Sequence, residues 1–277
     1  MADTTVIILT RNEELNIKEC IDSLKGFARR IIVVDSGSED DTPTIARQMG
    51  AEVYFREFDT HARQFNWALD NIEITTPWIY RIDADERLTP ELIAELDTLS
   101  SQHLDDDVTG ISTEAWLHFC GGVIRHGCAN KRRIVMFRTG IGRMEDRKID
   151  EHTILSQGRV INARERFIHR DYKDMTHWIN KMNWYAEREV DDYMEYLSGT
   201  SAEIQNDEYV QSTRKKKYGF YYKFPKFFRC FLLFFYYYIF KGGFLDGVPG
   251  FIFNFMYHLW FRSLIDTKIY ERMNANE

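Results

Sequence analysis

Short apolar runs alternate with segments of helical periodicity along the first hundred residues. Such runs are typical of strands that are buried on both faces of a sheet, and they cover residues 6–9, 31–34, 52–55 and 78–82. Apolar side chains at helical spacing predict helices over residues 17–24, 42–49, 61–71 and 89–99. The last of these begins with Thr89 as a cap and Pro90 at the first helical position. Strands separated by helices in this way predict βαβ units, a mostly parallel sheet and an α/β fold.

The pattern changes after residue 109. Residues 109–168 carry short strand-like segments, turns and many Gly and Arg residues, and residues 176–197 predict one long helix. The polar stretch 198–207 is typical of a boundary. We therefore expect a catalytic domain over residues 1–200 and a helical extension over residues 201–277.

Charge is distributed unevenly. The 277 residues carry a net charge of -7, which argues against general nucleic-acid binding. Residues 209–245 nevertheless contain no Asp or Glu and eight Lys or Arg residues. This asymmetry indicates a local anionic partner.

The four cysteines show no CxxC pair and no metal-type spacing. We expect unpaired thiols in a reducing cytosol, with a Cys120–Cys128 pair across a hairpin as the alternative. The first residues lack the basic and long apolar segments of a signal peptide, so we expect a cytoplasmic protein.

Polar clusters follow three of the predicted strands: Thr10-Arg11-Asn12-Glu13, Asp35-Ser36-Gly37-Ser38 and Asp83-Ala84-Asp85-Glu86. Ligands of parallel sheets bind beyond the carboxyl ends of the strands. Asp83 and Asp85 are two residues apart, so both side chains face one side of an extended segment. Two such carboxylates suit Mg²⁺ or Mn²⁺, which also takes oxygens from substrate phosphates. A merely solvated acidic loop is the alternative for this motif taken alone.

Asp35 suits two roles, satisfying backbone donors in a turn and accepting a hydrogen bond from a nucleotide base or ribose. No GxGxxG follows any predicted strand, and the sequence contains no GxxxxGK[ST]. A dinucleotide-binding Rossmann site and a P-loop are therefore disfavoured.

These three clusters, in this order and spacing, resemble family 2 glycosyltransferases with the Rossmann-like GT-A fold. The similarity covers residues 4–170 and is strongest to the lipopolysaccharide-core, capsule and exopolysaccharide glucosyltransferase-like branch. The resemblance implies that Thr10, Asn12 and Glu13 line the nucleotide pocket and that Asp35 contacts uridine. It also implies that Asp83-Ala84 contacts the nucleotide-sugar and that Asp85 holds the metal. Asn66, in Arg63-Gln64-Phe65-Asn66, corresponds to the ARN segment of the superfamily.

An inverting transfer needs a base that takes the proton of the acceptor hydroxyl. Two carboxylate groups suit this role, the pair Glu145-Asp146 and the segment Asp150-Glu151-His152. Chemistry alone does not choose between them. The resemblance favours Glu151, because Lys148-Ile149-Asp150-Glu151-His152 is similar to the family segment that carries the base.

Basic side chains crowd the segment between the metal motif and the predicted base: Arg125, His126, Lys131, Arg132, Arg133 and Arg138. A diphosphate leaving group needs cations, and Arg suits phosphate geometry. We assign Arg138 to the donor. A solvated basic face is the alternative for the group, and a structural role is the expectation for His126 and His152.

The extension is rich in aromatic residues. Residues 230–240 are an uncharged run too short to span a membrane, and residues 251–265 form a second apolar stretch after glycine-rich turns. Two short helices joined by a bend fit this pattern. Lys and Arg beside aromatic rings are typical of an interfacial helix on anionic lipid. A helical subdomain packed on the catalytic domain and a homodimer interface are the alternatives.

The sequence therefore predicts a metal-dependent inverting glycosyltransferase. We expect a UDP-hexose donor, with glucose as the sugar, and a lipid-linked saccharide acceptor at the inner face of the cytoplasmic membrane. A metal-dependent nucleotidyltransferase and a membrane scaffold with a nucleotide-binding domain are the alternatives.

Overall fold

The computed structural model describes residues 3–103, 106–128, 132–145, 152–198 and 221–274. The chain divides into two compact units. Unit 1 comprises Met1–His118 and Asn130–Tyr172, and unit 2 comprises Phe119–Ala129 and Lys173–Glu277. The predicted domain boundary between residues 200 and 201 lies outside the described residues, so that division stays a prediction.

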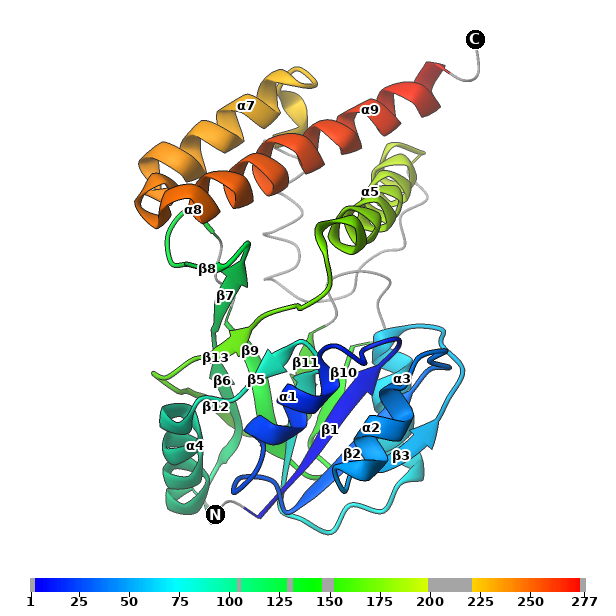
Figure 1. Cartoon of the computed structure of the whole chain (residues 1–277), viewed down its shortest axis with the longest axis vertical. Coiled ribbons are helices and arrows are strands. Elements are labelled where there is room, and N and C mark those ends of the chain that lie inside the picture. The colour runs from blue at the N-terminus through cyan, green and yellow to red at the C-terminus, as the bar shows by residue number, and fades with distance from the viewer. Residues whose placement is uncertain (1–2, 104–105, 129–131, 146–151, 199–220, 275–277) are drawn as a thin grey trace. The chain divides into compact units, whose positions relative to one another are not determined.

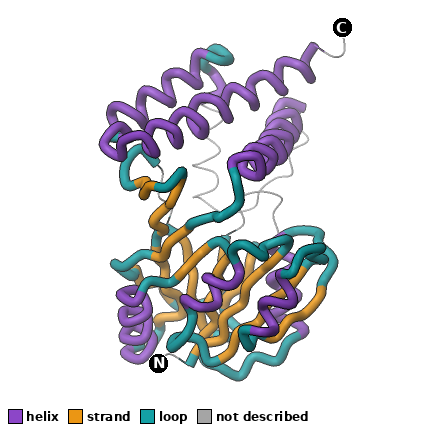
Figure 2. Tube along the Cα trace, viewed as in Figure 1, coloured by secondary structure: helices purple, strands orange, loops and turns teal. Residues whose placement is uncertain are grey.

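Unit 1 is built on a seven-stranded sheet with the order β12-β6-β9-β4-β1-β2-β3 (Figures 1 and 2). Its strands are β1 (Thr4–Thr10), β2 (Arg30–Asp35), β3 (Glu52–Phe55), β4 (Trp78–Asp83), β6 (Val108–Thr113), β9 (Arg133–Arg138) and β12 (Arg159–Asn162). β9 runs antiparallel to both of its neighbours, and the other pairs are parallel. The predicted α/β fold with a mostly parallel sheet is confirmed.

Helices cover both faces of this sheet: α1 (Ile17–Ser23), α2 (Thr42–Gln48), α3 (His61–Asn71) and α4 (Pro90–Gln102). Successive residues of a strand point to opposite faces. Val6 and Ile8 accordingly lie in one apolar cluster with residues of α1, α2 and α4, whereas Ile7 and Leu9 lie in a second cluster with residues of α3. This is why the strands are continuous apolar runs.

Shorter strands complete unit 1: β5 (Glu86–Arg87), β7 (Ala115–Phe119), β10 (Gly142–Met144), β11 (Thr153–Leu155) and β13 (Phe167–His169). β13 pairs antiparallel with β5, which places His169 opposite Glu86. β10 and β11 form a hairpin. These strands bring the later part of the chain to the polar residues that follow β4.

Unit 2 is mainly helical. Its elements are β8 (Gly122–Ile124), α5 (Met175–Ser198), η1 (Tyr221–Lys223), α7 (Phe228–Phe235), η2 (Tyr236–Phe240), η3 (Gly243–Asp246), α8 (Gly247–Asn254), η4 (Phe255–Trp260) and α9 (Phe261–Asn274). α7 and η2 form one continuous helix, as do α8, η4 and α9, with π-helical turns at η2 and η4.

The core of unit 2 lies between α5 and α9. Met182, Ala186 and Val190 pack against Phe261 and Ile265. Ion pairs reinforce the contact, including Arg262 with Glu189 at 2.9 Å. The long helix predicted over residues 176–197 is therefore confirmed, and it belongs to unit 2 by its contacts.

The extension contains two helical segments joined by a bend, as predicted. Among the described residues no single helix is long and apolar enough to cross a membrane. The segments Phe228–Phe240 and Gly243–Asn274 reach that length and composition only as a pair, and they are bent by 69°. All four cysteines are free thiols, two of them buried.

Candidate active site

The polar residues at the ends of β1, β2 and β4 meet at one edge of the sheet. In the register, Thr10 lies opposite Asp35, and Leu9, its neighbour, lies opposite Asp83. Because these strands are parallel, their carboxyl ends share this edge. The structure thus brings together the three clusters that the sequence placed after separate strands.

Asp35 organises the loop that follows β2. Its Oδ1 accepts hydrogen bonds from the Thr10 hydroxyl at 2.9 Å and the Ser38 hydroxyl at 2.5 Å. Its Oδ2 accepts from the backbone N–H groups of Gly37 and Ser38 at 3.0 and 2.9 Å. The carboxylate is buried, and these four donors hold it in place. Asp35 therefore fixes the loop after β2 at the edge of the site.

The loop after β1 is tied to the same turn. Asn12 has a positive φ of 55°, a conformation that Asn tolerates better than most residues. Its N–H donates to the Ser38 hydroxyl at 2.8 Å, and its side-chain oxygen accepts from the Glu39 N–H at 2.8 Å. The N–H of Glu13 donates to the Thr42 hydroxyl at 2.7 Å. The two loops form one cross-linked edge.

Asp83 lies between two arginines. One guanidinium nitrogen of Arg81 lies 3.5 Å from Oδ1, and one of Arg133 lies 3.3 Å from Oδ2. Burial raises the pKa of the Asp83 carboxyl, but the charges of these two arginines outweigh burial and hold the pKa below its usual value. Asp83 is therefore a carboxylate at neutral pH. Ala84, in contrast, is buried in the apolar core, so its side chain faces away from the site.

Asp85 is paired with a histidine that sequence reasoning missed. His169, the last residue of β13, has Nε2 3.2 Å from Oδ2 of Asp85. The backbone holds this arrangement, because the N–H of Arg170 donates to the Asp85 carbonyl at 2.8 Å. Carboxylate oxygen and imidazole nitrogen are both ligands of Mn²⁺ and related cations.

The donor set at Asp85 fits a divalent cation that is completed by substrate. The described residues contain no group of three His, Cys, Asp or Glu side chains placed to hold a metal. Mg²⁺ and Mn²⁺ sites of nucleotide enzymes use one or two protein carboxylates and take further oxygens from phosphates. Asp85 with His169 satisfies this requirement.

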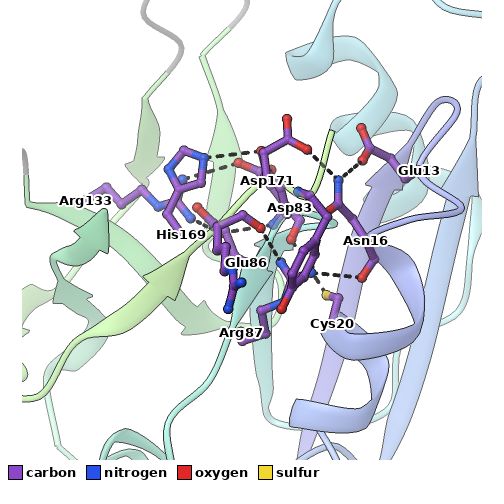
Figure 3. A network of polar contacts seen from close by, with 12 residues as sticks. Glu13, Asn16, Cys20, Asp83, Glu86, Arg87, Arg133, His169 and Asp171 are labelled. Carbon is purple, nitrogen blue, oxygen red and sulfur yellow. Dashed lines mark hydrogen bonds and ion pairs between the residues drawn. The ribbon is translucent and has the colours of Figure 1, made fainter. Parts of the chain in front are cut away.

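The buried side chain of Glu86 is paired with the partly exposed guanidinium of Arg133 (Figure 3). The Glu86 carboxylate accepts from the Asp83 N–H at 3.1 Å and from the Arg133 guanidinium. Burial raises the pKa of Glu86 above its usual value, against the opposing charge of Arg133. The Arg133 guanidinium also lies over the ring of Phe167, 4.7 Å from its centroid. Arg133 thus fixes Glu86 and Asp83 together.

Asn16 is a second residue that the sequence did not single out. It is fully buried, and its amide nitrogen donates to both Glu13 and Asp171 at 2.8 Å. Its side-chain oxygen accepts from the Tyr172 N–H at 2.9 Å, and its carbonyl accepts from Arg87 at 3.2 Å (Figure 3). It connects the loop after β1 to the chain after β13. The available sequence signal was a polar residue directly before an apolar helical stripe.

The side chain of Asn66 is hydrogen-bonded to the backbone of β10. Its amide nitrogen donates to the Met144 carbonyl at 2.7 Å, and its oxygen accepts from the Met144 N–H at 2.9 Å. Glu145 follows, and its N–H donates to the His152 carbonyl at 2.9 Å. The predicted base Glu151 and the alternative Asp146 lie outside the described residues. Asn66 therefore fixes the chain where it enters that segment.

Arg138 is not part of this group. It lies opposite Trp78, the first residue of β4, whereas Asp83 is the last. Its guanidinium lies over the Trp78 ring at 4.6 Å and donates to the Val108 carbonyl at 3.2 Å. The predicted role of Arg138 in donor binding does not fit this position, because β4 spans the sheet between it and the acidic motif.

Comparisons with known proteins give the family of this chain. Residues 5–113 match the model of glycosyl transferase family 2. A lipopolysaccharide core biosynthesis glycosyltransferase of Rhizobium meliloti is 30% identical over 201 residues, covering 69% of this chain and 72% of that protein. The chain belongs to glycosyl transferase family 2. The family that the sequence resembled is therefore confirmed.

Other relatives of this family 2 protein match over a shorter stretch. An uncharacterized glycosyltransferase of Rickettsia felis is 37% identical over 106 residues, which are 38% of this chain and 37% of that protein. The chain therefore spans little more than a third of the length of such relatives. A crystal structure of glucosyl-3-phosphoglycerate synthase from Mycobacterium tuberculosis, in complex with Mn²⁺, UDP and glucosyl-3-phosphoglycerate, is 23% identical. The similarity covers 42% of this chain and 44% of that one, with a TM-score of 0.34.

Proposed function

We propose that this family 2 glycosyltransferase is an inverting, metal-dependent enzyme that transfers a hexose, with glucose as the first candidate, from a UDP-sugar. The acceptor is a lipid-linked saccharide of lipopolysaccharide, capsule or exopolysaccharide synthesis at the inner face of the cytoplasmic membrane. The single observation that carries the proposal is the convergence of Asp35, Asp83 and the Asp85–His169 pair at one edge of the sheet.

The donor end of the reaction follows from the charges at this edge. Departure of UDP leaves negative charge on the diphosphate, and a bound divalent cation neutralises part of it. Asp85 and His169 would hold that cation. Asp83 is kept ionised by Arg81 and Arg133 and suits the ribose hydroxyls as an acceptor. The cross-linked loops at Asn12 and Asp35 supply a firm wall for the uridine.

The acceptor end needs a base. In a direct displacement the acceptor oxygen attacks the anomeric carbon as its bond to the diphosphate breaks, and the hydroxyl proton passes to the base. Glu151 is the proposed base, and Glu145 with Asp146 is the alternative. Asn66 acts as a positioning residue, because it holds Met144 directly before this segment.

The acceptor class is inferred from similarity. The Rhizobium meliloti relative is named for lipopolysaccharide core biosynthesis, and its match extends over most of both chains. A lipid-anchored saccharide is consistent with the aromatic and basic extension of unit 2.

The test is a panel of nucleotide-sugars with Mn²⁺ or Mg²⁺, scored for release of UDP and for transfer to lipid-linked saccharides. We expect the enzyme to accept UDP-glucose as a donor. Asp85→Asn should abolish metal-dependent UDP binding. Glu151→Gln should keep UDP binding and lower turnover by about a hundredfold or more, the range of general base catalysis. Asp97→Asn, on helix α4, is the matched control. Near-normal turnover of Glu151→Gln would refute the base. Conversion of a UDP-sugar and added pyrophosphate into UTP and a sugar 1-phosphate would indicate a nucleotidyltransferase.

A further inference from the structure

Exposed apolar side chains are concentrated in one part of unit 2. Of the 23 large hydrophobic side chains that are exposed among the described residues, 14 lie between Phe224 and Phe255. Single exposed apolar residues are ordinary, but a contiguous group of this size marks an interaction surface. We call the group formed by α7, η2, η3 and α8 the apolar face.

The continuous helix of α7 and η2 has its apolar side turned outward. Phe228, Phe231, Phe235 and Ile239 are all exposed, and their spacing places them on one side of a helix. The opposite side buries a charge. Arg229 donates to the Asp266 carboxylate of α9 at 3.0 Å, and both side chains are almost fully buried. This is the reverse of the distribution in a helix that faces water.

The turn between the two helical segments is the most exposed part of this face. Phe240 is 80% exposed, Val248 70% and Leu245 62%. The rings of Tyr238 and Phe251 pack edge to face, with centroids 5.7 Å apart. The aromatic contacts join η2 to α8, so the exposed side chains of both belong to one surface.

The turn is held rigidly. Asp246 accepts from the backbone N–H groups of Arg125 and His126 at 2.9 and 2.8 Å. The N–H of Gly127 donates to the Lys241 carbonyl at 3.1 Å. A Cβ on Gly127 would lie 2.6 Å from the Gly243 Cα, so the two backbones are in close contact. The exposed apolar residues are thus presented by a fixed frame.

The charges near the apolar face indicate which partner binds it. Between residues 209 and 265 the sequence has only one carboxylate, Asp246, and its side chain is 4% exposed. The next one, Asp266, is buried against Arg229. Lys223 and Lys241 are exposed. Among its described residues, 221–265, the charges shown to solvent are therefore cationic, and they lie beside Phe and Tyr rings. This is the composition of a surface that binds anionic lipid.

The bend limits how deep the surface reaches. The segments Phe228–Phe240 and Gly243–Asn274 are bent by 69°, and no single helix among the described residues is long and apolar enough to cross a membrane. An amphipathic element that lies in the interface buries its apolar face only into the headgroup and upper acyl region. The bent pair of segments therefore fits insertion into one leaflet of a bilayer.

We propose that the apolar face docks this enzyme on anionic membrane, with the turn around Phe240, Leu245 and Val248 inserted into one leaflet and Lys223 and Lys241 at the headgroups. The inference deepens the proposed function, since it names the surface that brings the enzyme to a lipid-linked acceptor. Lipid binding by this surface does not require donor turnover.

Flotation of the full chain with vesicles tests the surface. The wild type should float with phosphatidylethanolamine–phosphatidylglycerol vesicles and less with phosphatidylcholine alone. Phe240→Ser and Val248→Ser should each weaken partitioning about tenfold, because each removes an apolar side chain from the acyl region. Tyr270→Ser, an exposed aromatic on α9 beyond the apolar face, is the control and should float as the wild type does.

Phe240→Trp provides a second readout. Its fluorescence, measured as the difference from wild type, should be quenched by brominated lipid tails if this position enters the acyl region. High salt should weaken binding without abolishing it, because screening removes only the electrostatic part.

Unchanged flotation of Phe240→Ser and Val248→Ser, or a wild type that floats with neither kind of vesicle, overturns the proposal. So does a stable dimer in solution that becomes monomeric in Phe240→Ser. UDP binding with Mn²⁺, measured without lipid, separates the two proposals. Vesicle binding without any response to nucleotide-sugars would refute the proposed donor and keep the surface, and the converse would refute the surface alone.

Discussion

Nε2 of His169 lies 3.2 Å from Oδ2 of Asp85, although 84 positions of sequence separate the two residues. β13 carries His169 to this place by pairing with β5, which directly follows the acidic motif. The pair places an imidazole nitrogen of His169 beside a carboxylate oxygen of Asp85.

His169→Ala should weaken Mn²⁺-dependent UDP binding by about 10- to 100-fold, the usual effect of losing a supporting group at a metal site. Binding measured without metal should change little. Titration calorimetry with UDP, with and without Mn²⁺, makes the comparison. His118→Ala, on β7, is the matched control. Equal metal-dependent affinity in His169→Ala and wild type would show that His169 does not serve the metal.

Arg133→Met should lower the free energy of unfolding by about 3 kcal/mol at pH 8, because it leaves Glu86 buried without its cation. Urea denaturation measures the loss. Arg143→Met is the control, since Arg143 and Asp70 are both about half exposed and such pairs contribute at most about 1 kcal/mol.

The stability of Arg133→Met should depend on pH in a defined direction. Burial already raises the pKa of Glu86 above its usual 4.5, and loss of Arg133 raises it further. The folded protein then binds more protons than the unfolded chain at pH values above 4.5, so stability falls as pH rises. Arg133→Met should therefore lose less stability, relative to wild type, at pH 5 than at pH 8. An equal loss at both would contradict the burial of an ionised Glu86.

Asn66→Leu should cost about 1–3 kcal/mol of stability, because both backbone groups of Met144 lose their side-chain partner. Turnover should fall with little change in the KM for the donor, since the chain entering the segment of Glu151 is loosened. Steady-state kinetics and denaturation measure both effects. Asn71→Leu removes a single exposed hydrogen bond to the Trp67 carbonyl and should leave kcat unchanged. A rise in KM alone would instead indicate direct donor contact by Asn66.

Acid should weaken unit 2 through His258. Burial, and then the charge of Arg262, lower the pKa of this imidazole to about 4, although Nε2 donates to the Gly127 carbonyl at 3.2 Å. Between pH 6.5 and pH 4 the unfolded chain binds the proton and the folded one does not, so stability falls as pH falls. The loss reaches about 3 kcal/mol at pH 4.

His258→Gln keeps a donor near Gly127 and does not titrate, so its unfolding temperature should depend less on pH across this window. Circular dichroism melts at several pH values provide the measurement. The same slope in both proteins would rule out His258 as the titrating group.

Much of the candidate site follows from local sequence. Apolar runs and helical stripes depend on neighbours within one element, which is why the predicted strand at residues 52–55 coincides with β3 and the helix at residues 61–71 with α3. Parallel strands then place Thr10, Asp35 and Asp83 at one edge without further information.

The tertiary structure decided which of these side chains contact one another. Arg133 and Arg138 are both arginines of β9, but a strand rises about 3.3 Å per residue, so five positions carry them to opposite edges of the sheet. The antiparallel register puts Arg133 beside Asp83 and Arg138 beside Trp78. Likewise, only packing against α9 turned Arg229 inward and its phenylalanine neighbours outward. Sequence determined which groups lie at the end of each strand, because that depends on local periodicity. The fold determined which of them meet, because register and packing depend on residues far apart in the chain.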